Sequence, residues 1–129
     1  MREILFRAKR EDNGEWAYGY YVRLPDAAGS ASMIHTPARN PDESNSSHFI
    51  RSITIGQYTG LTDKNGTKIF EGDIVEYEGT RYSINYLPHY ARFSAVKPNT
   101  VFCVFAYQRG EVIGNIYDNP ELIGGGEQI

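Results

Sequence analysis

The 129-residue sequence has one cysteine, Cys103, and this residue lies in an apolar run. A single cysteine cannot form a disulfide within the chain, so the disulfide framework of small secreted domains is excluded. A free cysteine among apolar residues packs as a small hydrophobic side chain unless a base or a positive charge activates its thiol. We therefore expect a structural role for Cys103.

Long apolar runs and an excess of positive charge are also missing. No segment approaches the roughly 20 apolar residues of a membrane-spanning helix, and residues 1–7 lack the apolar core of a signal peptide. These absences predict a cytoplasmic protein without membrane contact. The net charge is −3, which does not favour a double-stranded DNA binder because such proteins neutralise phosphates with Lys and Arg.

Motifs that hold metals or cofactors are absent as well. The three histidines, His35, His48 and His89, do not have the spacing of a zinc site. The Asp63–Gly66 segment resembles the middle of a calcium loop, but the flanking positions do not supply the carboxylates of that motif. No phosphate-binding glycine loop and no serine-nucleophile motif occurs. We expect no metal and no cofactor.

Two residue pairs leave an enzyme open as an alternative: Glu71 with Asp73, and Cys103 with His89. Acidic side chains two residues apart lie on the same side of a strand, where they more often form a solvated surface than an acid–base pair. Either pair would have to converge in a pocket to act as a catalytic site. We predict that the protein is not an enzyme and has no catalytic residues.

The sequence does contain the marks of turn-rich β-structure, with 13 glycines and 10 tyrosines. Residues 4–8 and 15–23 flank the turn signal Asp12-Asn13-Gly14 and predict an N-terminal hairpin. Residues 25–47 contain three prolines and many small residues, so we expect a long loop with at most a brief strand at 33–35. Residues 49–55 resume a β-pattern that places Ile53 and Ile55 on one face.

Residues 56–75 are punctuated by glycines where a β-chain reverses or bulges. Asn65-Gly66 predicts a tight reversal, and Asp63 is placed to accept hydrogen bonds from its backbone. Gly72 indicates a bulge or corner, next to which Asp73 can bind backbone N–H groups. The residues to which we assign a structural role in turns and fold are Gly56, Gly60, Asp63, Asn65, Gly66, Gly72, Asp73 and Gly114.

The second half of the sequence predicts further strands. Glu78-Gly79 separates two β-patterned runs and predicts a hairpin, and residues 101–107 are apolar enough for a central strand. A short helix within 86–98 or a turn after Pro120 stays open. We expect one domain over 1–129 that is mainly β: a small barrel-like core at 50–118, SH3-like or partly open, with the hairpin and loop of 1–49 packed on it, and a tail at 119–129.

Aromatic side chains are the remaining signal for function. Trp16, Tyr18 and Tyr20 alternate with smaller residues and therefore share one strand face, while Gly19 leaves room for another backbone to approach. Tyrosine is enriched in protein–protein interfaces, and the acidic balance favours a protein partner or self-association over the alternative, stacking of single-stranded nucleic acid. The predicted interface comprises Trp16, Tyr18, Tyr20, Tyr21, Tyr82, Tyr86 and Tyr90.

Three separated motifs resemble, in the same order, those of the YopX family of small phage and prophage proteins. They are REILFRA at residues 2–8, GQYTGLTDKNG with IFEGDIV within residues 56–75, and EVIGNIYDNPEL at residues 111–122. The resemblance implies a β-rich fold with a barrel-like core and a location in a bacterial host cell. The family has no established activity, so the resemblance assigns no catalytic residue.

Overall fold

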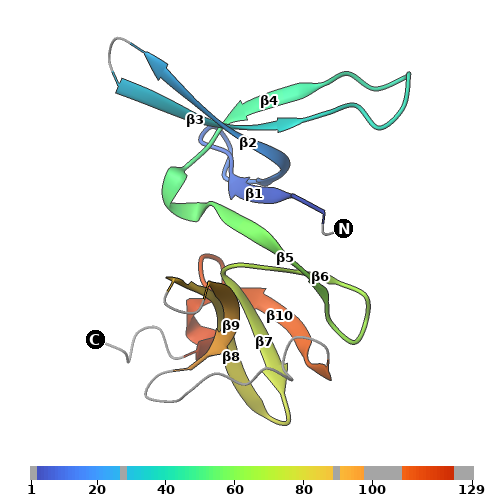
Figure 1. The fold of residues 1–129 in the computed structure, drawn as a ribbon, viewed down its shortest axis with the longest axis vertical. Helices are drawn as coiled ribbons and strands as arrows, with labels where there is room; N and C mark the ends of the chain where they lie inside the picture. Colours follow the sequence, from blue (N-terminus) through green and yellow to red (C-terminus); the bar gives the residue numbers. More distant parts are fainter. Residues whose placement is uncertain (1–2, 27–28, 89–90, 98–108, 124–129) are drawn as a thin grey trace. The chain divides into compact units, whose positions relative to one another are not determined.

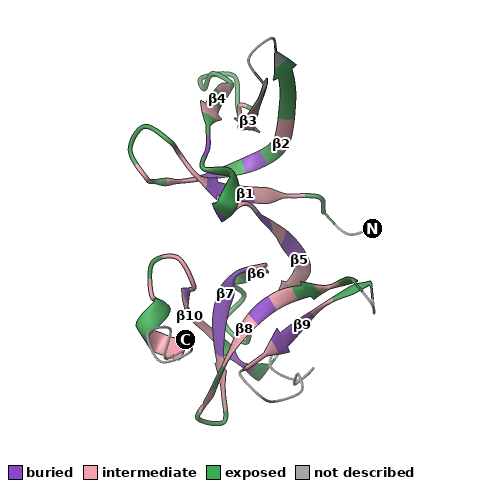
Figure 2. Cartoon of the chain, turned by 90° about the vertical axis from the view of Figure 1, so that its left-hand side faces the viewer, coloured by how far each residue is buried: buried purple, intermediate pink, exposed green. Residues whose placement is uncertain are grey.

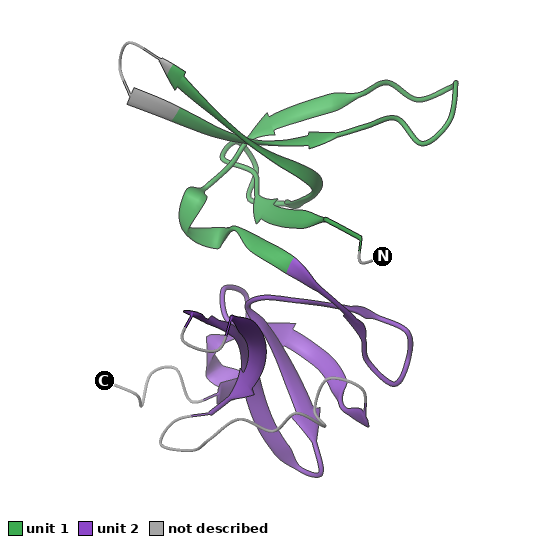
Figure 3. Ribbon diagram, viewed as in Figure 1, with its two compact units in different colours: residues 1–57 green, residues 58–129 purple. Residues whose placement is uncertain are grey.

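The computed structural model describes residues 3–26, 29–88, 91–97 and 109–123. Figure 3 shows that the chain divides into two compact units, Met1–Gln57 and Tyr58–Ile129. The predictions for Tyr90, for the Cys103–His89 pair and for a central strand at 101–107 lie outside the described residues.

The first unit is built from antiparallel strands in the order β4-β3-β2-β1, followed by the start of β5 (Figure 1). The pairing of β1 with β2 confirms the N-terminal hairpin. The bounds are β1 (Phe6–Lys9), β2 (Trp16–Asp26), β3 (Gly29–Thr36), β4 (Ser46–Phe49) and β5 (Gly56–Thr62), with a short 3-10 turn, η1 (Ser52–Thr54), before β5.

One face of this sheet forms the core of the first unit. Its buried residues are small or branched, with Ala8 and Ala17 paired across β1 and β2. Phe6 and Tyr21 pack at its margin with ring centroids 6.0 Å apart. An antiparallel bridge between Arg10 and Ile50 brings the chain after β4 back beside β1. The opposite face of the sheet therefore lies outside this core.

The expectation of a long loop at 25–47 was wrong, because β3 and β4 account for much of it. β1 pairs only with the Trp16–Gly19 part of β2. At Pro25, β2 therefore has a described partner strand on one side only, β3. Proline, which lacks a backbone N–H, is tolerated at such an edge position. The expected strand through Ile53 was also wrong. Ile53 lies in η1 and is 83% exposed.

The second unit contains the rest of β5, paired with β6 (Lys68–Phe70), and a separate four-stranded antiparallel sheet. The order of that sheet is β10 (Glu111–Asn115), β7 (Asp73–Tyr77), β8 (Thr80–Leu87) and β9 (Arg92–Val96), and η3 (Pro120–Ile123) follows. The core of this unit consists of Ile69, Val75, Ile84 and Ala95. Figure 2 shows that β7 is the most continuously buried strand.

The mainly β fold is thus confirmed, in two antiparallel sheets. The strands of the described residues do not close into one barrel, and the barrel-like, SH3-like character of 50–118 stays a prediction. Within 86–98, where a short helix was left open, the described residues include the end of β8 and the strand β9. The turn after Pro120 is the 3-10 turn η3.

Asp63 anchors the hairpin between β5 and β6, as predicted. Its Oδ1 accepts hydrogen bonds from the backbone N–H groups of Asn65 and Thr67 at 2.8 and 2.9 Å. Its Oδ2 accepts a third from the Val112 N–H at 2.8 Å. Only Gly66 in this turn has a positive φ, 84°, so the reversal needs the left-handed conformation at one residue and not at Asn65.

Asp73 and Gly72 also have the expected local roles. The Asp73 carboxylate is 2% exposed and accepts a hydrogen bond from the Phe70 N–H at 2.7 Å. Gly72 has a φ of 93° at the corner before β7, where an added Cβ would lie 3.3 Å from the Tyr117 ring. These contacts are structural, because they satisfy buried backbone donors.

The turn Glu78-Gly79 allows a test of local backbone strain. Both residues have positive φ, 51° and 77°, as in a type I′ hairpin. Replacing Glu78 with Asn is expected to stabilise the protein by about 0.5–1 kcal/mol, because Asn tolerates this conformation far better. Urea denaturation should show the gain in Glu78→Asn and none in Glu78→Ala, and equal midpoints for both variants would contradict the assignment.

Candidate binding groove

A groove in the first unit gathers the exposed aromatic side chains of β2. Trp16, Tyr18 and Tyr20 all line it, and the two tyrosines are 44% and 51% exposed. Because alternate residues of a strand point to one face, these rings lie opposite the core face that holds Ala17. The predicted common face of the three aromatics is confirmed.

The strands β2 and β3 form the floor of the groove, and they approach each other closely at Gly19. A Cβ at Gly19 would overlap the backbone carbonyl of His35, and its distance to the Thr36 Cα would be only 3.2 Å. Gly19 also has a φ of 157°. The prediction that Gly19 admits a neighbouring backbone is therefore confirmed. The Thr36 hydroxyl donates a hydrogen bond to the Tyr18 carbonyl at 2.6 Å and fixes the groove edge.

Two segments wall the groove. Glu3 and Leu5 border it on the side of the N-terminal segment. On the other side it is bordered by residues in and beside the connection from β3 to β4: Thr36, Pro37, Ala38, Arg39, Glu43, Ser44 and Ser46. That connection is stabilised internally: the Asn45 Oδ1 accepts a hydrogen bond from the Ala38 N–H at 2.7 Å. Figure 1 shows it as a long projection between the two strands.

The charges along the groove are largely paired. Arg39 donates its backbone N–H and its guanidinium to Glu43, which together lower the pKa of that carboxyl. Arg10 binds Asp12 through two hydrogen bonds at 3.0 and 2.7 Å; these lower the pKa of Asp12 and raise that of Arg10. Residues 1–57 carry seven Lys and Arg and seven Asp and Glu. The groove therefore provides aromatic surface with little net charge.

Two cationic side chains of β1 lie near the Trp16 ring. The Arg7 guanidinium carbon lies 4.6 Å from the centroid of the Trp16 ring, and the Lys9 Nζ lies 5.6 Å from it. Cation–π contacts of this kind hold an indole in one orientation. The sequence analysis did not identify Arg7 and Lys9, although the hairpin register, in which they face Tyr18 and Trp16, could have indicated them.

The other aromatic residues of the predicted interface do not share this groove. Tyr21 points to the opposite face and packs against the core of the first unit. Tyr82 packs against the core of the second unit. Tyr86, also in the second unit, is 44% exposed and meets Phe93 edge-on at 5.2 Å. Conversely, the segment 36–46, which walls the groove, was missed because it was interpreted as an unstructured loop.

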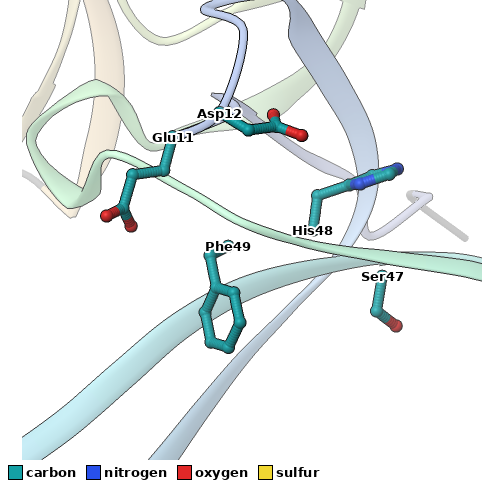
Figure 4. Close-up of a pocket in the computed structure, with 5 residues that line it drawn as sticks. All are labelled: Glu11, Asp12, Ser47, His48 and Phe49. Carbon is teal, nitrogen blue, oxygen red and sulfur yellow. The ribbon is translucent and has the colours of Figure 1, made fainter.

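A second hollow lies beside β4, lined by Glu11, Asp12, Ser47, His48 and Phe49 (Figure 4). Phe49 is 55% exposed. The carboxylate of Asp12 and the ring of His48 lie on the same side of the strand in Figure 4, while Phe49 points to the other side. Nothing in the sequence analysis indicated this hollow.

The structure describes one of the two residue pairs that were kept as a catalytic alternative, Glu71 with Asp73. Asp73 is buried and bonded to the backbone, whereas Glu71 is half-buried. Among the residues that the structure describes, no three His, Cys, Asp or Glu side chains are grouped so as to hold a metal ion. Within the same residues, no helix is both long and apolar enough to cross a membrane.

Comparison with known proteins identifies the family. The family model of the YopX protein matches residues 5–124. The chain belongs to the YopX family. The family match contains the groove residues of β2, the hairpin anchored by Asp63 and the segment of β10.

A solved structure supports the same fold assignment across the chain. The crystal structure of protein EF1440 from Enterococcus faecalis is 29% identical in sequence, with a TM-score of 0.56. The match covers 95% of this chain and 99% of that one. No curated protein matches the sequence.

Proposed function

We propose that this YopX-family chain is a non-enzymatic accessory protein of a phage or prophage, and that its β-module binds a protein partner or a second copy of itself. The observation that carries this proposal is the aromatic groove of Trp16, Tyr18 and Tyr20. The proposed location is the cytoplasm of the bacterial host cell.

The chemistry of the groove supports a protein ligand. Tyr and Trp contribute large contact areas with few rotatable bonds, which is why they dominate interface energies. Tyr18 and Tyr20 are exposed in the unit that carries them. Of the charged groups that line the groove, Arg39 pairs with Glu43, and Arg10 pairs with Asp12 outside the groove. A neutral, aromatic surface gives up little hydration when another protein covers it.

The proposal predicts that removing the two exposed rings abolishes association. In Tyr18→Ser/Tyr20→Ser, binding should weaken about 100-fold or more, since an interface hot spot contributes ~2 kcal/mol or more. Light scattering after size exclusion measures self-association, and pulldown from host lysate measures partner capture. Ile53→Ser is the matched control, because Ile53 is exposed but outside the groove. A wild-type monomer that captures nothing would overturn the proposal.

Single-stranded nucleic acid is the second candidate ligand. The observation that favours it is the placement of Arg7 and Lys9 beside Trp16, since bases stack on aromatic rings next to cations. The test is fluorescence anisotropy with labelled oligonucleotides at low and high salt. The electrostatic contribution is strongest at low salt, so absence of binding there rejects this candidate.

A further inference from the structure

The sheet face that carries the exposed tyrosines of β2 continues across β3 and β4 (Figure 1). Residues directly opposite each other in an antiparallel pair share one face. Tyr20 lies opposite His35, and His35 lies opposite Ser47, so these three form one row across the three strands. The His35 Nδ1 and the Ser47 Oγ are hydrogen-bonded at 2.8 Å on this face. We call it the open face, because the core of the first unit lies on the other side.

The next row of the open face is apolar. Val22 lies opposite Met33, and Met33 lies opposite Phe49. About half of the surface of Phe49 is exposed, as it is at Tyr18 and Tyr20. An aromatic side chain has roughly 150–250 Å² to bury, so these three leave roughly 300 Å² for a partner. Two such faces together would bury less than ~1,200 Å², the size of weak and reversible complexes.

His35 is the one side chain of these two rows that changes charge between pH 5 and 8. Its neighbours on the open face come from β2, β3 and β4 and carry no charge in that range: Tyr18, Tyr20, Val22, Met33, Ser47 and Phe49. The charged side chains around the rows belong to β1 and to the groove lining: Arg7, Lys9, Glu3, Arg10, Arg39 and Glu43. The two rows are therefore uncharged while His35 is neutral, and positive once it binds a proton.

A second copy of the open face is the occupant that suits these rows. An uncharged face loses little solvation when an identical uncharged face covers it, and sheets pack face to face through such side chains. A twofold axis at the row of Tyr20, His35 and Ser47 places His35 of each copy against the same row of the other. A proton on each His35 then puts two positive charges into a covered interface, where charges without counter-ions are costly.

We propose that two copies of the chain associate face to face through these two rows, and that proton uptake by His35 separates them. This inference rests on the function proposed above, since Tyr18 and Tyr20 belong to the same face. It assigns a second copy as the ligand and makes association dependent on pH. Association requires the neutral imidazole, so it is strongest above about pH 7 and is lost as the pH falls through the range in which histidine is protonated.

Sedimentation equilibrium of the full chain at pH 7.5 and pH 5.5, at one ionic strength, measures this effect. Each copy takes up a proton on separation, so the dimer dissociation constant should rise at least about tenfold at pH 5.5. Net charge has the opposite effect, because protonation of the three histidines changes it from −3 to 0 and so reduces the repulsion between copies. Weaker association at pH 5.5 therefore requires a local charge in the interface.

Three variants assign the effect to this face. His35→Gln should dimerise equally at both pH values, because glutamine stays polar beside Ser47 and takes up no proton. His48→Gln is the matched control, since His48 lies opposite the core residue Ile34, and it should keep the pH response of the wild type. Tyr18→Ser/Tyr20→Ser should be monomeric at both pH values.

The outcomes separate this proposal from the function on which it rests. A dimer that is equally stable at both pH values, or a pH response that persists in His35→Gln, would overturn the pH control and leave association through the tyrosines standing. Loss of amide dispersion at pH 5.5 would also overturn it, since unfolding would then explain the separation. A wild-type monomer at both pH values would overturn the proposal as a whole, and the capture of a different protein would then decide the function of the groove.

Discussion

Asp63→Asn is expected to lower the free energy of unfolding by about 3 kcal/mol, although the side chain barely changes in volume. The carboxylate is 5% exposed and accepts three backbone N–H groups, from Asn65, Thr67 and Val112. An asparagine offers one acceptor oxygen, so its NH₂ group must face at least one of these donors. A buried donor without an acceptor costs most of its desolvation free energy.

The pH dependence of this effect has a definite sign. Burial of the Asp63 carboxylate opposes ionisation, but the N–H donors of Val112, Thr67 and Asn65 outweigh it and lower the pKa below the ordinary 3.8. The stabilisation is therefore complete above the unfolded-state pKa and is lost as the pH falls through the folded-state value. The difference between wild type and Asp63→Asn should be constant at neutral pH and shrink below about pH 4.

Urea denaturation followed by circular dichroism at several pH values measures both effects. Asp42→Asn is the matched control, because it makes the same chemical change at an exposed carboxylate, and it should alter stability by less than ~0.5 kcal/mol. If Asp63→Asn were as stable as this control at pH 7, Asp63 would not be the anchor of its hairpin.

Gly19→Ala is the second substitution with a large expected effect, a loss of about 3 kcal/mol of stability. An added methyl group would overlap the His35 carbonyl and would lie 3.2 Å from the Thr36 Cα. Both neighbours are backbone atoms of the paired strand β3, so they cannot move aside as a flexible side chain could. The β2–β3 pairing beneath the aromatic groove should therefore separate locally.

Gly79→Ala separates this overlap from backbone strain. Gly79 also has a positive φ, 77°, but nothing lies within 4 Å of an added Cβ. Its loss should be limited to the ~1–2 kcal/mol of a left-handed alanine. Amide hydrogen exchange should show faster exchange in β2 and β3 for Gly19→Ala only. Equal losses of stability in the two variants would mean that the strand approach at Gly19 is not restrictive.

Local features of the fold were predictable from the sequence because they depend on nearby residues. The turns at Gly66 and Gly79 require left-handed backbone conformations, which glycine adopts without strain. Asp63 could be assigned to its turn, since its Oδ1 contacts lie two and four residues away. Its third contact, with Val112, joins residues 49 apart, and no periodicity in the sequence indicates such a pairing.

The candidate groove was predictable only in part. Alternation along β2 placed Trp16, Tyr18 and Tyr20 on one face, and the structure confirms this. Alternation alone cannot distinguish a core face from an exposed face, so Tyr21 was assigned to the interface although it packs with Phe6. The groove walls depend on β3 and β4, and the prolines of 25–47 concealed these strands because proline usually interrupts a sheet.

The most direct test of the central claim is site-specific photo-crosslinking from the groove floor. Benzoylphenylalanine replaces Tyr20 in the full chain, and in a control it replaces Ile53, which is exposed but outside the groove. After irradiation in host cells, the account predicts a discrete protein adduct from position 20, either with a second copy or with one other protein, and none from position 53. No adduct at position 20, or an adduct that nuclease digestion removes, would contradict protein binding by the groove.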